Sequence, residues 1–551
     1  MAVSDAIHTP QLDENIDWPT HGHYEYAHLY TSRKEITTFD NIASIRASYD
    51  YIVIGAGPIG AALAYRLALN EPQSSILIIE KNWNEPDRIV GELMQPAGCQ
   101  AMSALGLGMA FSGIDAVPVH GYYIAYKGKH MHVPYINKPG GGDRFRGVSF
   151  HHGRLVMNIR AACKAQANIT CLEASVTALD AAGFGSGGEI TDVRGVRIGP
   201  ARDSGDSGDS GDEKGAAVAA RLTMVCDGIT SQFRKVLNPE PVTLISHFCG
   251  FVLEHEPIAS AEFFTGAAGA TTHFAQPHSP AANPLPMPHN GHVLLDGIGP
   301  VLLYQMSERE TRVLADIPGG ALPSEASGQL RSVLRDSLSR AAPAALYPGL
   351  HRLLMDTLEQ AKRIRCIGSK FIPATANHVD GAVWIGDALN VRHPLTGGGM
   401  TIGLWDVVLL TDLLRNSPKD PATLRRIKAQ WYWQRRPRAL VINTLSVALH
   451  ALFAAETKEL GLLREACFMY LSWGSHYTMH PSGFLSGLMP SPILLVFHFF
   501  SVAIVAVWLR VSGASSAYAG GNLLFRMYSA LYTLYVASGV ILPFMWKEMQ
   551  P

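Results

Sequence analysis

The sequence predicts an α/β fold whose chain ends in membrane-associated helices, and three observations predict it. A β-branched run, a glycine-rich loop and an Ala/Leu-rich segment follow one another at residues 51–69. A second strand-like run leads into glycines and a helical pattern at residues 383–414, and the longest apolar runs lie near the C-terminus. The length of 551 residues suggests two or more structural units.

The composition is that of a near-neutral chain with few charges. Lys+Arg total 45 and Asp+Glu total 46, so the net charge is −1, and charged residues make up 17%, against about a quarter in an average protein. This balance excludes a strongly basic nucleic-acid binder and a highly charged disordered chain. The seven cysteines form no CxxC pair. We therefore expect neither a disulfide scaffold nor a thiolate zinc site, and we expect a reducing compartment.

Three polar segments are expected to lie outside the folded units. Residues 1–49 are a polar N-terminal extension without the apolar run of a signal peptide. Residues 199–215 repeat Ser, Gly and Asp, and residues 265–290 are rich in Ala, Pro and His. We expect both to be flexible insertions that carry no chemistry.

The first folded element is a dinucleotide-binding junction. The run YIVI at residues 51–54 predicts a buried parallel strand, and the loop GAGPIG follows it at once. Gly55, Gly57 and Gly60 would give a tight turn, close approach to a pyrophosphate and close helix–strand contact. The second predicted strand, at residues 76–79, ends in Glu80, which can accept hydrogen bonds from a ribose. A chance glycine turn is the alternative, and the motif alone does not choose between FAD and NAD(P).

A second junction favours FAD. The predicted strand at residues 383–385 ends in Gly-Asp, and the glycines at residues 397–399 precede a predicted helix over residues 401–414. This arrangement suits a long cofactor held at two places, with Asp387 at ribityl or ribose hydroxyls and the amides of Gly397, Gly398 and Gly399 near the pyrophosphate and flavin. Asp227 lies in a third strand-to-turn segment, which alone would be an ordinary Asp-Gly turn.

The C-terminal end carries two long apolar segments. Residues 492–509 have no formal charge, and residues 523–546 are interrupted only by Arg526. Both are close to the length of about 20 residues that spans a bilayer. The aromatic residues suited to a membrane interface are Trp508, Tyr528, Tyr532, Tyr535 and Trp546. Membrane association is expected, by two spans or by monotopic insertion; a pair of buried core helices is the alternative.

Longer motifs give a family resemblance. They are GAGPIG (55–60), EPDRIVGELMQPAG (85–98), FHHGR (150–154), CDGITSQFRK (226–235) and GDALNVRHPLTGGGMT (386–401). With SHFCGF (246–251) and REACFMY (464–470) they resemble the squalene monooxygenase family, also called squalene epoxidase, of the fungal type. The resemblance covers about residues 50–550. Val391 and Ala97 depart from it, where the family usually has Met and Gly.

The resemblance implies an FAD-binding, glutathione-reductase-like Rossmann fold of group E flavin monooxygenases, α+β in a β-sheet substrate domain. The implied division is an extension at 1–49, FAD-binding parts at 50–130 and 376–420, a connection at 131–170, a substrate domain at 171–375, a helical region at 421–490 and membrane-associated helices at 491–551.

The implied activity is the epoxidation of squalene to (S)-2,3-oxidosqualene, a step of sterol or triterpenoid biosynthesis. FAD and O2 would act through a flavin C4a-hydroperoxide, with electrons from NADPH delivered by NADPH–cytochrome P-450 reductase. The implied place is the endoplasmic reticulum or microsomal membrane, in contact with membrane lipid and with the catalytic domain in the cytosol. Two alternatives stay open: a relative that acts on another isoprenoid or in a specialised triterpenoid pathway, and a silent lipid-binding flavoprotein.

The resemblance also implies site residues. Tyr122 and Gln95 would form a catalytic pair joined by a hydrogen bond, although Tyr122 could equally be a packed aromatic. The cofactor candidates are Gly55, Gly57, Pro58, Ile59, Gly60, Glu80, Lys81, Arg88, Leu93, Arg154, Val176, Asp227, Asp387, Gly397, Gly398, Gly399 and Met400. For Arg154 a surface ion pair is the alternative.

Two further expectations concern the substrate pocket and metals. The candidate pocket residues are Phe248, Phe251, Leu303, Tyr304, Phe371 and Pro373, and more weakly Phe468 and Tyr470. No metal site is expected, because the histidines are scattered and His151-His152 is better explained by packing.

Overall fold

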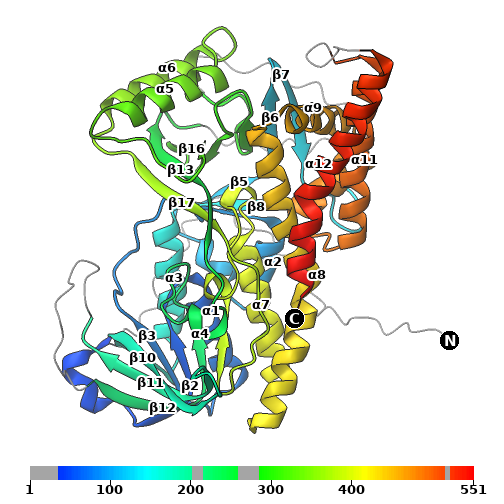
Figure 1. Cartoon of the computed structure of the whole chain (residues 1–551). Helices are drawn as coiled ribbons and strands as arrows, with labels where there is room; N and C mark the ends of the chain where they lie inside the picture. The colour runs from blue at the N-terminus through cyan, green and yellow to red at the C-terminus, as the bar shows by residue number, and fades with distance from the viewer. Residues whose placement is uncertain (1–34, 202–214, 259–283, 516–521, 551) are drawn as a thin grey trace.

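The structure is a computed structural model, and it describes residues 35–201, 215–258, 284–515 and 522–550. Most of the predicted extension at 1–49 and of the predicted insertions at 199–215 and 265–290 lies outside the described residues. Figure 1 shows two large sheets, one in the lower and one in the upper half of the view, with a long helix, α8, running beside both.

The first sheet has eight strands. In spatial order they are β1 (Thr37–Thr38), β9 (Ile169–Glu173), β3 (Ile76–Glu80), β2 (Ser48–Ile54), β12 (Ala216–Val225), β11 (Ile190–Gly199) and β10 (Ser175–Phe184), and β18 (Ala382–Trp384) also pairs with β12. The pairs from β1 to β12 and the pair β12–β18 are parallel, whereas β10, β11 and β12 pair antiparallel.

The register of this sheet brings three loops to one edge. Val225 lies opposite both Ile54 and Trp384, at the carboxyl ends of β2, β12 and β18. The segments that follow these residues therefore leave the sheet side by side. Ligands of open parallel sheets bind at this edge.

Helices cover the first sheet. They are α1 (Pro58–Asn70), α2 (Pro96–Ala104), α3 (His152–Lys164), α4 (Arg234–Leu237) and α7 (Gly399–Leu414), with short 3₁₀ turns η2 (Phe39–Ser44), η3 (Gly108–Phe111), η4 (Gly386–Ala388) and η5 (Pro394–Thr396). α1 begins with Pro58, whose fixed φ suits a first helical position, and all its Ala and Leu side chains except Leu69 are buried.

The second sheet has seven strands and is mainly antiparallel. Its order is β17 (Arg365–Phe371), β13 (Thr243–Glu254), β16 (Glu310–Pro318), β15 (Val301–Gln305), β14 (Gly291–Leu294), β6 (Gly121–Tyr126) and β7 (Lys129–Pro134). A small third sheet contains β4 (Leu93–Met94), β8 (Gly147–Ser149) and β5 (Val117–Val119). One face of the second sheet packs under α5 (Gln329–Ala341) and α6 (Pro348–Gln360), and the other contributes to a core with the C-terminal helices.

The strand order differs from the predicted division of the chain. Strands β10, β11 and β12, within the predicted substrate region at 171–375, belong to the first sheet. Strand β6, within the predicted FAD-binding part at 50–130, belongs to the second sheet, where it pairs with β14. The chain therefore crosses between the two sheets more often than a linear division by sequence allows.

Five helices form the C-terminal part: α8 (Pro421–Ala454), α9 (Lys458–Ser472), α10 (His476–Leu485), α11 (Pro492–Ser512) and α12 (Leu523–Met549). α11 and α12 coincide closely with the two predicted apolar segments. Ser491 caps the N-terminus of α11, since its side chain accepts a hydrogen bond from the amide of Leu494. α8, α11 and α12 are long and apolar enough to cross a membrane by length and composition.

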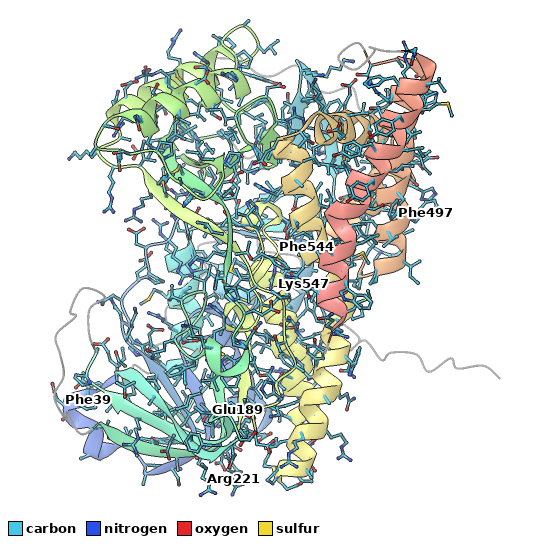
Figure 2. All side chains as sticks on the ribbon, viewed as in Figure 1. Phe39, Glu189, Arg221, Phe497, Phe544 and Lys547 are labelled. Atoms are coloured by element: carbon cyan, nitrogen blue, oxygen red, sulfur yellow. A yellow bond between two sulfur atoms is a disulfide. The ribbon has the colours of Figure 1, made fainter. Side chains whose placement is uncertain are left out.

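The outer faces of α11 and α12 are apolar and exposed. Exposed side chains include all five predicted interfacial aromatics, and Tyr535 is 73% exposed. Figure 2 shows Phe497 at the outer edge of α11, whereas Phe544 of α12 packs edge-on against Phe371 of β17 with ring centroids 5.0 Å apart. Large exposed apolar surfaces mark interaction sites, and these faces suit association with a membrane.

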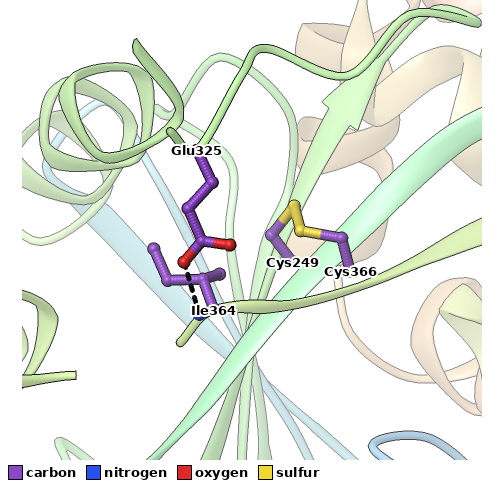
Figure 3. The surroundings of a disulfide bond; sticks show 4 residues. All are labelled: Cys249, Glu325, Ile364 and Cys366. Atoms are coloured by element: carbon purple, nitrogen blue, oxygen red, sulfur yellow. Dashed lines mark hydrogen bonds between the residues drawn. A yellow bond between two sulfur atoms is a disulfide. The ribbon is translucent and has the colours of Figure 1, made fainter. Parts of the chain in front are cut away.

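One disulfide joins two neighbouring strands of the second sheet. Cys249 of β13 and Cys366 of β17 are directly opposed, with Cα atoms 4.2 Å apart (Figure 3). Beside them the amide of Ile364 donates to the carboxylate of Glu325 at 3.0 Å. No sequence pattern indicates this pair, because the two cysteines are 117 residues apart and only the strand register brings them together.

Candidate functional site

One cavity of about 1400 Å³ lies where the carboxyl edge of the first sheet meets the second sheet. Its lining includes both glycine-rich junctions and apolar positions of β14, β15, β16 and β17. Typical ligand pockets measure about 300–1,000 Å³. The cavity is therefore large enough for a dinucleotide together with a second ligand.

The three glycines of the first junction differ in what surrounds them. A Cβ added to Gly55, whose φ is +95°, would lie 2.7 Å from the carbonyl oxygen of Cys226, and one added to Gly60 would lie 2.0 Å from the carbonyl oxygen of Gly55. No atom lies within 4 Å of a Cβ added to Gly57, which lines the cavity. Gly55 and Gly60 are thus fixed by packing, and Gly57 keeps the loop open toward a ligand.

Glu80 and Arg160 brace this loop. A Glu80 carboxylate oxygen accepts a hydrogen bond from the amide of Ala56 at 2.8 Å, and Nε of Arg160 donates to the carbonyl of Ala56 at 2.9 Å. Nη2 of Arg160 lies 3.6 Å from the same Glu80 oxygen. Burial lowers the pKa of Arg160, and Glu80 opposes this shift. Glu80 therefore supports the loop in addition to lining the cavity.

The second junction is tied to the Asp227 turn by Arg234. Its Nη2 donates to the carbonyl oxygens of Asp387 and Gly228 at 2.8 and 3.0 Å. This arrangement places Asp227 and Asp387 beside one cavity. Burial raises the pKa of Asp227, while the nearby hydroxyl of Ser231 opposes the shift.

Several buried polar atoms in the cavity lining have no hydrogen-bond partner among the described residues. They include Oδ1 of Asp227, Nε of Arg392 and Oγ1 of Thr396. Buried polar groups are nearly always paired, so these atoms indicate a ligand rich in hydrogen-bonding groups. Arg392 is 7% exposed and supplies a positive charge suited to phosphate or an anionic ring. The residues present thus fit a flavin dinucleotide.

The predicted hydrogen bond between Tyr122 and Gln95 is replaced by another. Oε1 of Gln95 accepts from the hydroxyl of Tyr135 at 2.8 Å, and Nε2 of Gln95 donates to the carbonyl of Thr396 at 2.8 Å. The ring of Tyr122 packs edge-on against Tyr135 at 5.7 Å, and its hydroxyl makes no hydrogen bond of normal geometry to a described residue. Burial raises the pKa of Tyr122 to about 12, although the proximity of Tyr135 and Gln95 lowers it.

Most predicted site residues line the cavity. Besides Tyr122 and Gln95 they are Gly55, Gly57, Pro58, Ile59, Glu80, Lys81, Arg88, Leu93, Val176, Asp227, Asp387, Gly397, Gly399 and Met400. Three predicted residues do not. Gly60 lies behind the loop, and a Cβ on Gly398 would lie 2.4 Å from Cγ2 of Ile442 in α8. Arg154 instead makes an exposed ion pair with Asp115 at 2.5 Å.

Comparisons with known proteins place the chain in a family. A family model described as squalene epoxidase matches residues 219–264 and 273–519, just over half of the chain. Squalene epoxidase ERG1 of Candida albicans is 35% identical over 545 residues, which cover 91% of this chain and 99% of the relative. The chain belongs to the squalene epoxidase family.

Other relatives agree with this assignment. Squalene epoxidase erg1 of Aspergillus fumigatus is 36% identical and covers 91% of this chain and 93% of its own length. The squalene monooxygenase of Mus musculus is 33% identical and covers 94% and 82%.

Solved flavoproteins share the fold of this squalene epoxidase family member. Klebsiella pneumoniae HpxO complexed with FAD and uric acid aligns with a TM-score of 0.54 and 17% identity, covering 80% of this chain and 97% of that one. PqsL of P. aeruginosa in complex with 2-aminobenzoylacetate aligns with a TM-score of 0.53 and 18% identity, covering 74% and 96%. At these identities the likeness concerns the fold alone.

The apolar end of the cavity differs in part from the expected one. Leu303 and Tyr304 line it as predicted, together with Val293, Leu302, Leu314 and Ile367. Phe248, Phe251, Phe371, Pro373, Phe468 and Tyr470 are not among the lining residues. Strand alternation explains Phe251, which is buried in the core under α5 and α6. Phe371 instead packs against Phe544.

A buried charge beside the apolar lining is fully paired. The carboxylate of Glu92 accepts hydrogen bonds from Nη2 and Nε of Arg312 at 2.7 and 2.8 Å and from the hydroxyl of Tyr304 at 3.0 Å. Burial and the Glu92 charge raise the pKa of Tyr304, so the phenol stays neutral. Because the carboxylate is satisfied by these donors, it leaves no bare charge toward the cavity.

Proposed function

We propose that this chain is an FAD-dependent monooxygenase that epoxidises squalene with O2, a step of sterol biosynthesis. One observation carries the proposal: a single cavity is lined on one side by two glycine-rich junctions with unpaired polar atoms and on the other by apolar side chains. The family membership and the names of the relatives support the choice of substrate.

The residues of the glycine junctions would hold FAD. Gly57 leaves room for the pyrophosphate beside the N-terminus of α1, and Asp387 and Arg392 offer a carboxylate for hydroxyl groups and a guanidinium for anionic groups. When bound, FAD supplies the redox and oxygen chemistry of the reaction. The chain's own residues bind the cofactor, fix its orientation and exclude water.

The apolar side of the cavity suits a hydrocarbon chain. Squalene has no polar group, so its recognition depends on shape and apolar contact. Leu302, Leu314 and Ile367 provide such contacts. Because the Glu92 carboxylate is paired with Arg312, it presents no unpaired charge to the hydrocarbon. Tyr122 lies at the border between the two sides, and we propose that its hydroxyl acts there on a bound ligand.

We also propose the source of the electrons and the cellular place. NADPH would act through NADPH–cytochrome P-450 reductase, since the GxGxxG loop between a strand and a helix, at residues 55–60, is assigned to FAD. The other GxGxxG string, at residues 183–188, lies at the turn between β10 and β11. The exposed apolar faces of α11 and α12 would attach the protein to the endoplasmic reticulum membrane, with the catalytic part in the cytosol.

The proposal is tested by reconstitution. We expect purified protein to carry flavin and to convert squalene to 2,3-oxidosqualene in the presence of O2, NADPH and the reductase. Turnover of another polyene without this product would favour a relative with a different isoprenoid substrate. Flavin that the reductase cannot reduce would favour a silent lipid-binding flavoprotein.

A substitution tests the second cofactor junction. Asp387→Ala should leave the folded protein without bound flavin, because it removes the carboxylate of that junction, and the visible absorption spectrum measures the loss. Asp356→Ala, on the exposed side of α6, is the matched control and should keep the flavin. Retained flavin in Asp387→Ala would show that this assignment is wrong.

A further inference from the structure

Four polar side chains are buried together where α8, the second sheet and the loop before α7 meet. They are Ser246 of β13, Asp316 of β16, His393 and His450, and each is at most 8% exposed. Oγ of Ser246 lies 2.5 Å from Oδ1 of Asp316 and 2.9 Å from Nε2 of His393. Nε2 of His450 lies 2.9 Å from Oδ2 of Asp316. None of these four residues is among those that line the cavity.

The direction of these hydrogen bonds follows from one backbone amide. The N–H of Leu395 donates to Nδ1 of His393 at 3.3 Å. Burial holds the pKa of His393 well below its usual range, so the ring is neutral and its single proton is on Nε2. Nε2 therefore donates to Ser246, Ser246 donates to Asp316, and Asp316 also accepts from His450.

This direction argues against a metal site and against a nucleophilic serine. The ligating atoms of Asp316, His393 and His450 lie within 4.8 Å of one another, but a metal-bound histidine donates its other ring N–H, whereas Nδ1 of His393 is an acceptor. An activated serine would give its proton to the histidine, and here the histidine gives its proton to Ser246.

The network spans the two sides of the cavity. His393 directly precedes Pro394–Thr396, and the carbonyl of Thr396 is held by Gln95. The next residues, Gly397, Gly399 and Met400, line the cavity. Asp316 and Ser246 belong to the second sheet, and the ring of His393 packs against that of Phe248 at 5.3 Å.

We propose that Ser246 and His393 are positioning residues, which fix the loop of residues 394–400 relative to the second sheet and so set the distance between the flavin and the substrate. The inference rests on the proposed function, since it assigns the loop to the flavin. Asp316 and His450 anchor the network in the sheet and in α8. The network would align the flavin and the substrate for oxygen transfer. In such a step, displacing the reacting groups by about 1 Å lowers the rate on the order of 100-fold.

The test uses the full-length, flavin-loaded protein with Ser246→Ala. We expect retained flavin, a shifted visible circular dichroism spectrum of the flavin, and a fall on the order of tenfold in epoxide formed per NADPH consumed, with little change in KM for squalene. Ser337→Ala is the matched control. Ser337 is buried in α5, which covers the opposite face of the same sheet, and its hydroxyl also accepts a hydrogen bond from a loop, here from the amide of Ile298. Ser337→Ala should change neither the circular dichroism spectrum of the flavin nor the epoxide formed per NADPH consumed.

His393→Asn gives a second, independent arm. The Asn side-chain oxygen can still accept from the amide of Leu395, so the η5 turn is kept, while the link to Ser246 and the ring contacts with Phe248 and His450 are lost. We expect the same spectral and coupling changes as in Ser246→Ala, and a double variant no worse than either single one.

Three results would overturn the inference: Ser246→Ala behaving like Ser337→Ala, additive effects in the double variant, or stoichiometric zinc in the purified protein that Ser246→Ala releases. The circular dichroism measurement of the flavin needs no squalene. A protein that binds flavin but forms no epoxide would therefore refute the proposed function and leave the spectral test of the network intact.

Discussion

The two glycine-rich junctions hold the same cavity but depend on different parts of the molecule. In the first, the close contacts of Gly55 and Gly60 are atoms of the loop itself and of Cys226 and Asp227, which directly follow β12. In the second, a Cβ on Gly398 would meet Ile442 of α8, and one on Gly397 would lie 3.2 Å from Nε2 of Gln95. The first junction is therefore complete within the α/β part, whereas the second is assembled against the C-terminal helices.

A second contact supports this difference. The segment between α10 and α11 packs against α2 and α7 at the second junction. The amide of Ala97 in α2 donates to the carbonyl of Ser486 at 3.1 Å. A Cβ on Gly487 would lie 3.1 Å from that of Ala97 and 3.2 Å from Cγ2 of Thr401. α8 and the segment between α10 and α11 thus pack against the second junction.

The largest expected effect comes from Gly60→Ala. The new Cβ would lie 2.0 Å from the carbonyl oxygen of Gly55, a backbone atom that no rotamer change can move away. We expect a loss of about 3 kcal/mol of stability, or failure to fold. Thermal unfolding of the flavin-free protein measures it.

Gly57→Ala is its control within the same loop. Apart from the neighbouring residues in the chain, no atom of the described residues lies within 4 Å of the added Cβ, so the stability of the flavin-free protein should stay within about 0.5 kcal/mol of wild type. Flavin affinity should fall, because the methyl group occupies space on the cavity side. Equal destabilisation by the two substitutions would contradict the distinction between packed and open glycines.

Gly398→Ala should cost less than Gly60→Ala, about 1–2 kcal/mol, because its contact is a side-chain methyl group of Ile442 that can shift. Ile442→Leu removes that β-branch at nearly constant volume. The double variant should be more stable than the sum of the single effects predicts, by about 0.5 kcal/mol or more in a double-mutant cycle. Thermal unfolding of the four proteins measures the coupling.

The same Ile442→Leu change should not rescue Gly60→Ala, since the contacts of Gly60 are Gly55 and Cys226, in the loops that follow β2 and β12. Rescue of both glycine variants would mean that α8 supports both junctions equally. Rescue of neither would show that Ile442 does not limit the space at Gly398.

The features that could be predicted from sequence are those with local signals. The β2–α1 junction follows from a β-branched run, three spaced glycines and Pro58, and α11 and α12 follow from long apolar runs bounded by capping residues. The second junction likewise follows from a strand-like run that ends in Gly-Asp and from the glycines at residues 397–399. In these segments the neighbours in sequence determine the backbone conformation.

The features that were missed depend on contacts between distant segments. Arg154 and Arg160 both lie on α3, but a spacing of six residues projects them from different faces, so Arg160 reaches Ala56 while Arg154 meets Asp115. Cys249 meets Cys366 only through the strand register. Likewise, the choice of Tyr135 as the partner of Gln95 depends on how β7 and the following residue sit over α2.

A smaller loss of stability than those of Gly60→Ala and Gly398→Ala is expected from Tyr135→Phe, which bears on the second junction alone. The hydroxyl of Tyr135 donates to Gln95, whose Nε2 holds the carbonyl of Thr396. Its loss removes one buried hydrogen bond, and we expect a cost of about 1 kcal/mol. Thermal unfolding with and without flavin should place most of that cost in the flavin-loaded protein.

Tyr122→Phe is the control for the loss of stability expected from Tyr135→Phe. The Tyr122 hydroxyl has no hydrogen bond of normal geometry to lose among the described residues, so stability should change by less than about 0.5 kcal/mol, while epoxidation should fall. Because burial raises the pKa of Tyr122 to about 12, the phenol is protonated throughout neutral pH, and the loss should be independent of pH between about 6 and 9. If Tyr122→Phe instead destabilised the protein as much as Tyr135→Phe and left turnover unchanged, Tyr122 would be a packed aromatic and the ligand contact would belong to another residue of the cavity.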